Sequence, residues 1–265
     1  MELFYRKLGE GQPFIILHGL YGSSDNWVSI ARELSANFEI WLIDLRNHGR
    51  SPHSKYHNYK LMVNDLYEFI NDHQLNKSIL LGHSMGGKLA MHFADSYPEL
   101  LSHLIIIDIA PKSYVFSIDI QSDTLNHKRI MEGMLAVDFT GLKKREELEL
   151  ELAKFIKNGQ IRQFLMKNIK RDQDMSFGWT LNIEALYQNL GNILDGFFPV
   201  NKKVIEDFPV LFLKGSESEY IKTQDMEEIK SYFPNAKLEV IPNAGHWLHV
   251  QEPERLVEKL KAFLM

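Results

Sequence analysis

The pentapeptide Gly82-His83-Ser84-Met85-Gly86 has the spacing of a nucleophilic serine on a sharp turn. It follows a short apolar run and precedes a stretch of helical period, so the serine would lie between a strand and a helix. The glycines are needed because side chains two positions either way would collide in such a turn. The turn would expose the hydroxyl, and the helix N-terminus would favour negative charge beside it. We therefore predict that Ser84 is a catalytic nucleophile.

A histidine that could activate this serine stands near the end of the chain. Asn243-Ala244-Gly245-His246 follows an apolar run, and a loop there can bring an imidazole back to the serine. His246 lies in the turn after a glycine, whereas His249 leads into the helix that Pro253 helps to start. We predict that His246 is the general base and that His249 is peripheral.

These residues need a scaffold, and the pattern of the chain indicates an α/β fold. Short apolar runs alternate with longer stretches of helical period, which is typical of a parallel sheet covered by helices. Each run is uniformly apolar, as expected when both faces of a strand are buried. The predicted strands are 13–17, 39–43, 78–81, 104–108, 210–213 and 237–241. The predicted helices are 24–35, 60–72, 85–96, 225–232 and 253–264.

The alternation stops in the middle of the chain, where the composition turns polar and helical. We predict a core formed by residues 1–110 and 206–265, with a helical lid, 111–205, inserted into it. Aromatic residues of this lid are candidates for lining an acyl pocket: Phe116, Phe155, Phe164, Trp179, Phe197 and Phe198. Four cations of this lid are candidates for contact with a coenzyme A phosphate: Lys112, Lys143, Lys144 and Arg145.

The composition excludes several other classes. The 265 residues include no cysteine, which rules out disulfides, thiol catalysis and cysteine–zinc sites. With 30 basic and 35 acidic residues, the net charge of -5 argues against nucleic-acid binding. No signal peptide, membrane span or metal-ligand motif is visible, so we expect a cytoplasmic protein without a metal. The oligomeric state stays open.

Taken together, the motifs resemble the α/β-hydrolase family, and within it the YbfF-type esterases. The matching segments are HGLYGSSDNW (18–27), DLRNHGRS (44–51), GHSMGGK (82–88), IDIAP (107–111) and AGHWLH (244–249). The resemblance implies the α/β-hydrolase fold with an inserted lid and hydrolysis of small acyl esters or acyl thioesters, including acyl-CoA. It implies no cofactor. Asp44, Arg46 and His48 fall in a loop of this pattern, and we interpret them as structural.

The resemblance also implies an oxyanion hole made of main-chain donors. The donors would be the N–H groups of Leu20, in the loop after the first predicted strand, and of Met85, which follows the nucleophile. Because both act through the main chain, the side chain of Leu20 matters little to the chemistry. His18, two positions earlier, is interpreted as a core histidine with satisfied hydrogen bonds.

Two positions could supply the acid that orients His246. Many members of the family carry it as G-x-x-D after a late strand, where this sequence has Ser218 beside Glu217. Asp108 instead closes an apolar run, where a carboxylate is costly to bury unless a partner such as an imidazole pairs with it. Its setting in IDIAP also matches the YbfF-type resemblance. We predict Asp108 as the acid and keep Glu217 as the reserve.

Three other functions remain as alternatives. A relative of this family could bind a ligand with little or no turnover, and another could hydrolyse a carbon–carbon bond. Residues 82–88 also read G-x-x-x-x-G-K, the skeleton of a phosphate-binding loop. Leu89 follows that lysine, however, where magnesium coordination needs a hydroxyl. The phosphate-loop hypothesis also leaves the segments around His18 and His246 without a role.

Overall fold

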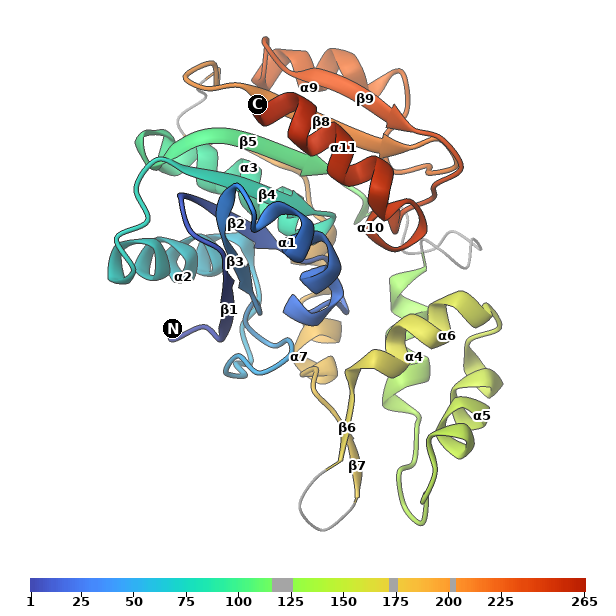
Figure 1. Ribbon diagram of the computed structural model, residues 1–265. Helices are drawn as coiled ribbons and strands as arrows, with labels where there is room; N and C mark the ends of the chain where they lie inside the picture. The colour runs from blue at the N-terminus through green and yellow to red at the C-terminus, as the bar shows by residue number, and fades with distance from the viewer. Residues whose placement is uncertain (116–125, 172–175, 201–203) are drawn as a thin grey trace.

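The computed structural model describes the chain except for residues 116–125, 172–175 and 201–203 (Figure 1). Its centre is a seven-stranded sheet in the order β1-β3-β2-β4-β5-β8-β9, parallel except for the antiparallel pair β1 and β3. The strands are β1 (Tyr5–Leu8), β2 (Gln12–Leu17), β3 (Phe38–Ile43), β4 (Ser78–His83), β5 (Leu101–Ile107), β8 (Val210–Gly215) and β9 (Lys237–Ile241). All six predicted strands are present.

Two edge strands depart from the sequence-based expectation. β1 was not predicted, because its residues alternate between exposed and half-buried positions instead of forming an apolar run. β9 was expected to be buried on both faces, and this is wrong: Ile241 is its one buried residue. An edge strand has a neighbour on one side only, so less of its surface is covered.

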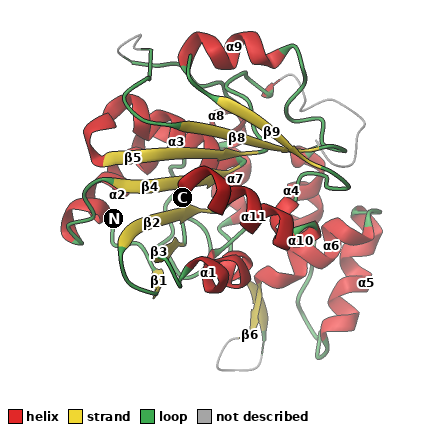
Figure 2. Cartoon of the chain, turned by 45° about the horizontal axis from the view of Figure 1, so that its top comes forward, coloured by secondary structure: helices red, strands yellow, loops and turns green. Residues whose placement is uncertain are grey.

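Helices cover both faces of the sheet (Figure 2). Side chains alternate along each strand, so Leu81 and Ile105 pack on one face while Leu80 and Ile106 pack on the other. The first face is covered by α1 (Val28–Leu34) and α11 (Pro253–Leu264). The second face is covered by α2 (Tyr59–Asp72), α3 (Met85–Ser96) and α9 (Asp225–Tyr232). These helices match those expected from the sequence, except that the first part of the helix expected over 24–35 is a 3-10 helix, Ser24–Trp27.

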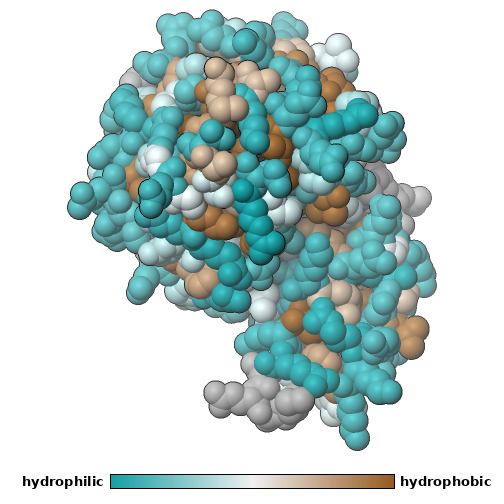
Figure 3. Space-filling model, in the orientation of Figure 1, coloured by the Kyte–Doolittle hydropathy of each residue, from teal (hydrophilic) through white to brown (hydrophobic). Residues whose placement is uncertain are grey.

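The elements between β5 and β8 do not join this sheet. They are α4 (His127–Leu135), α5 (Arg145–Phe155), α6 (Gly159–Leu165), β6 (Ile169–Arg171), β7 (Phe177–Trp179), α7 (Ile183–Gln188) and α8 (Leu190–Leu194). In Figure 1, α4, α5, α6 and the β6–β7 hairpin stand apart from the sheet, and Figure 3 shows a smaller lobe there. Within the described ranges, no helix has the length and apolarity needed to cross a bilayer.

Candidate active site

Ser84 lies on a strained turn between β4 and α3. Its backbone has φ 53° and ψ -117°, a conformation that costs free energy for any residue with a side chain. The flanking glycines permit it. A Cβ on Gly82 would lie 2.2 Å from the carbonyl oxygen of Gly86, and a Cβ on Gly86 would lie 2.5 Å from that of Leu17. Positions 82 and 86 are thus restricted to glycine by the close approach of the main chain, and this packing holds the Ser84 hydroxyl at the end of the sheet.

Asp108 follows β5 directly and is fully buried. One of its carboxylate oxygens, Oδ2, lies 2.8 Å from Nδ1 of His246 and also accepts a hydrogen bond from the hydroxyl of Ser218. The other oxygen accepts the N–H of Gly215 at 3.2 Å. Three donors therefore compensate the loss of hydration of this carboxylate, which would otherwise be costly. The histidine is one of them.

Glu217, the reserve candidate, does not reach His246. Its side chain is exposed, and its main-chain N–H donates to the carbonyl of Ala244. Ser218, which cannot act as the acid, instead supports the acid by donating to Asp108. The loop after β8 therefore still takes part in the site, although the carboxylate itself comes from the end of β5.

His246 stands in the loop between β9 and α10 (Leu248–Gln251). Its Nδ1–H donates to Asp108, which leaves Nε2 as the nitrogen available to act on Ser84. The ring of Tyr220 stacks on the imidazole with a centroid separation of 3.9 Å and an interplanar angle of 18°. His83 donates from Nε2 to the main-chain oxygen of His246 at 2.8 Å. Tyr220, His83 and Asp108 thus fix the ring, the main chain and the Nδ1 atom of His246, respectively.

Neighbouring histidines are kept neutral by their surroundings. Burial lowers the pKa of His127 to about 4 and that of His249 to about 3. Burial also lowers the pKa of His83. None of these rings carries a charge at neutral pH, so none places a second positive charge beside an imidazolium at His246.

His249, expected to be peripheral to the chemistry, is buried in the core. The residue is 3% exposed, and its ring stacks on the indole of Trp27 at 4.4 Å. It also meets the ring of His83 edge-on at 5.0 Å. Its place in the core follows from α10, a short helix whose first residues are buried.

The two predicted oxyanion donors lie beside the serine. Leu20 and Met85 line the same small cavity as Ser84. Met85 is the first residue of α3, so its N–H has no partner within the helix. The loop that carries Leu20 presses closely on the turn, since a Cβ on Gly19 would lie 3.1 Å from the Cβ of Ser84. This closeness suits two N–H groups that converge on one oxygen.

Residues interpreted as structural do hold loops. His18 is buried, accepts the N–H of Leu45 at Nε2 and donates from Nδ1 to the oxygen of Gly19. The carboxylate of Asp44 accepts the N–H groups of Ser24 and Arg50. Arg46 forms a buried ion pair with Asp65, and His48 donates to the oxygen of Arg46.

Two small cavities meet at Ser84. The smaller is bordered by Tyr114 and by Ile193 and Leu194 at the end of α8. The larger is bordered by His246 and by apolar residues of α4 and α6, with Trp247. Their linings are mostly apolar, which suits the acyl chain and leaving group of an ester better than a charged ligand.

The lid aromatics contribute less to these cavities than expected. Phe164 borders the larger one. Phe197 instead packs against the rings of Tyr232 and Phe233, and Trp179 packs on Phe139. Phe155 and Phe198 are exposed, and Phe116 falls outside the described residues. Tyr114, at the start of the insertion, and Tyr220, in the loop after β8, also line the site. Neither was predicted, because a tyrosine in a loop carries no periodicity that would mark it.

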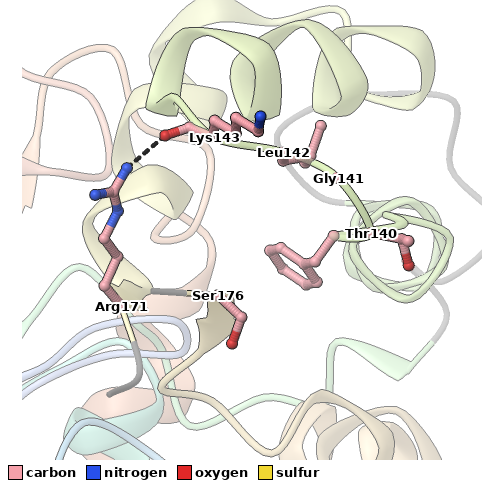
Figure 4. A pocket seen from close by; sticks show the side chains of 7 residues that line it. Thr140, Gly141, Leu142, Lys143, Arg171 and Ser176 are labelled. Atoms are coloured by element: carbon pink, nitrogen blue, oxygen red, sulfur yellow. Dashed lines mark hydrogen bonds between the residues drawn. The ribbon is translucent and has the colours of Figure 1, made fainter. Parts of the chain in front are cut away.

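A third cavity lies away from Ser84, in the insertion (Figure 4). It is lined by residues 139–143 with Arg171 and Ser176, and it is wider than the two cavities at Ser84. None of the catalytic candidates borders it. In the described part of the chain, no three carboxylate or imidazole groups converge as metal ligands.

Replacement of Asp108 by asparagine is expected to lower kcat for ester hydrolysis by about 10² to 10⁴-fold. The amide would keep the volume of the side chain, but it would no longer stabilise a positive charge on His246. Glu217→Gln is the matched control, since its side chain is exposed, and it should stay within a few-fold of the original kcat. Steady-state kinetics on a p-nitrophenyl ester would measure both. Equal losses in the two variants would reject Asp108 as the acid.

Comparison with known proteins agrees with this geometry. Residues 12–253 match the family model described as the alpha/beta hydrolase fold. The chain is 37% identical to the sn-1-specific diacylglycerol lipase ABHD11 of Danio rerio, covering 97% of this chain and 79% of that protein. It is 30% identical to the esterase YbfF of Escherichia coli, covering 95% and 92%. A solved marine microorganism esterase superimposes with a TM-score of 0.93 at 46% identity, covering 99% of each chain.

Proposed function

The chain belongs to the α/β-hydrolase fold family and is an enzyme of its esterase/lipase type, and we propose that it works through a triad of Ser84, His246 and Asp108. The observation that carries the proposal is the 2.8 Å contact between His246 and the buried Asp108, beside a serine held on a strained turn. Each group lies just after a strand of one parallel sheet, and such strand ends are where α/β folds place their sites.

In this mechanism His246 takes the proton of Ser84 at Nε2 while the serine oxygen attacks the acyl carbonyl carbon. The carbonyl oxygen becomes an oxyanion and accepts hydrogen bonds from the N–H groups of Leu20 and Met85. His246 then donates its proton to the leaving alcohol or thiol, and an acyl-enzyme remains on Ser84. Water repeats the cycle with His246 as base, which releases the carboxylic acid and restores the serine.

The substrate that the site favours is an uncharged acyl ester or acyl thioester. Two mostly apolar cavities border Ser84 and would take the acyl chain and the leaving group. The relatives named as an esterase and a diacylglycerol lipase support the ester. Two of the cations considered for coenzyme A are already engaged, Lys112 with Asp225 and Arg145 with the carbonyl of Met166. Esters are therefore the first choice.

Residues 111–205 would act as a lid over this site. The supporting observation is that the larger cavity is walled by Ile130, Ile161, Phe164 and Leu165, all from the insertion. Apolar residues on a separate set of helices can exclude water from the acyl-enzyme without taking part in the sheet. A cytoplasmic location remains a prediction from the sequence.

A panel of substrates tests the proposed function. We expect many turnovers per active site with p-nitrophenyl acyl esters, and lower kcat/KM with the matching acyl-CoA thioesters. A burst of one product equivalent without further turnover would instead support a ligand-binding relative. Cleavage of a carbon–carbon substrate in preference to every ester would support that alternative. The phosphate-loop hypothesis gains nothing from the structure, since Lys88 contacts main-chain carbonyl oxygens.

A further inference from the structure

Lys88 is a buried cation that the proposed chemistry does not use. It lies on α3, one turn after the nucleophile, and it is 1% exposed. Its Nζ donates to the carbonyl oxygens of Pro111 at 2.9 Å, Lys112 at 2.5 Å and Asp195 at 2.8 Å. An ammonium has three N–H bonds, so all three find an acceptor. A buried lysine is rarely retained without such full pairing.

The three acceptors belong to the two ends of the insertion. We call residues 111–114 and 193–197 the stem segments, since the chain leaves the sheet through the first and returns through the second. They also pair with each other: Tyr114 N–H donates to Leu194, and Phe197 N–H donates to Pro111. The Lys88 ammonium thus bonds to both segments and ties them to the helix that begins at the nucleophile.

The stem segments also form one wall of the site. Tyr114, Ile193 and Leu194 border the smaller cavity beside Ser84, and the Lys88 side chain borders it with them. The Tyr114 hydroxyl donates to the main-chain oxygen of Tyr220, whose ring stacks on the imidazole of His246. A shift of the stem segments would therefore move this wall without displacing Ser84, which is fixed by its own turn.

We propose that Lys88 is a positioning residue for acyl binding, whose ammonium holds both stem segments so that their side chains wall the cavity at Ser84. The role assigned to the cavity rests on the function proposed above. The Lys88 ammonium would act through the stem segments, the rest of its side chain adds to the cavity wall, and neither takes part in proton transfer. Its loss should therefore raise KM for substrates that fill the cavity much more than it lowers kcat.

The charge of Lys88 gives this role a pH dependence. Burial lowers the pKa of Lys88 to about 7, helped by Lys112 and opposed by the carboxylates of Glu228 and Asp195. As the pH rises through this value the amine becomes neutral and keeps only two N–H donors for three carbonyls. Lys88 should therefore donate to all three carbonyl oxygens of the stem segments below about pH 7, and its attachment to these segments should weaken as the pH rises above that value.

Other titratable groups lie near Lys88, and their surroundings affect their charges in different ways. His92, one turn along α3, stays neutral because burial and the charge of Lys88 lower its pKa to about 4. Lys112 pairs with Asp225, and both lysine ammoniums lie about 5 Å from the ring of Tyr114. Burial raises the pKa of Glu228 on α9, which the charge of Lys88 partly offsets. An acidic group of α9 therefore also faces the ammonium.

Kinetics on esters of two lengths, combined with hydrogen exchange, test the proposal. Lys88→Met keeps most of the length of the side chain without its charge, and Lys154→Met, on the exposed face of α5, is the matched control. For Lys88→Met we expect KM for p-nitrophenyl octanoate to rise about tenfold, the effect of losing one or more charge-assisted hydrogen bonds. KM for p-nitrophenyl acetate and kcat for both esters should stay within about threefold.

The pH series supplies a readout that a merely structural lysine would not move. From about pH 6 to about pH 8, the wild-type ratio of octanoate KM to acetate KM should rise, and the protection of stem-segment amides against exchange should fall. In Lys88→Met both quantities should be independent of pH, and Lys154→Met should behave as wild type. An unchanged KM ratio and unchanged protection in a folded Lys88→Met would overturn the proposal.

Two further arms keep the outcome clear. If Lys88→Met does not fold, a wild-type stem protection that stays constant over the same pH range would overturn the proposal by itself. Failure of the proposed function looks different, because then Ser84→Ala would keep its ester hydrolysis while the exchange data on Lys88 remained readable.

Discussion

Ser84→Ala is expected to abolish ester hydrolysis, with a loss in kcat on the order of 10⁴-fold or more. The hydroxyl is the only group in the proposed mechanism that forms a covalent bond with the substrate, so no neighbour can replace it. The fold should persist, because alanine fits the volume of serine and meets the same backbone cost at φ 53°. Steady-state kinetics and a thermal melt of the purified variant measure both expectations.

Two comparisons sharpen this result. Ser84→Gly should be equally inactive but should melt at a higher temperature than Ser84→Ala, because glycine relieves the strain of the turn. Ser23→Ala should keep its activity, since Ser23 lies in a loop before α1 and outside the proposed chemistry. An active Ser84→Ala variant would show that Ser84 is not the nucleophile.

His246→Ala is expected to lower kcat by about 10³ to 10⁶-fold, since the serine would lose its proton acceptor and the leaving group its proton donor. His249→Ala should leave kcat within a few-fold. It should instead cost on the order of 2 kcal/mol of stability, because the ring of His249 fills a buried place against Trp27. Kinetics and urea denaturation of the two variants separate chemistry from packing.

The opposite pattern would show that the base has been assigned to the wrong histidine. In that case His249→Ala would be folded and inactive, while His246→Ala would turn over substrate at nearly the original rate. The rings of His83, His246 and His249 lie close together, so this control examines a real alternative.

Much of the scaffold could be predicted because strands that are buried on both faces of a parallel sheet consist of consecutive apolar residues. The central strands are uninterrupted apolar runs, and the structure confirms each of them. The edge strands of the sheet have a weaker sequence pattern. β1, with the sequence Tyr-Arg-Lys-Leu, reads as polar because it is covered on one side only, and β9 reads as more buried than it is. The β6–β7 hairpin, with three residues a strand, is too short to give a pattern.

The candidate site divides in a similar way. Ser84 and His246 follow from motifs in which glycine spacing has a steric reason, and Asp108 from the cost of burying a lone carboxylate. Ser218 and Lys88 could not be predicted, because their roles depend on partners that are distant in the chain. Lys88 reaches carbonyl groups more than 20 residues away, and carbonyl groups have no signature in a sequence.

The most direct test of the account is to find the atom that becomes acylated. Wild-type protein would be treated with a fluorophosphonate, digested, and its peptides sequenced by mass spectrometry. The account predicts one adduct per chain, on Ser84, formed in parallel with the loss of ester hydrolysis. Labelling of Ser23 or Ser51 with Ser84 unmodified, or full inactivation without any adduct on Ser84, would contradict it.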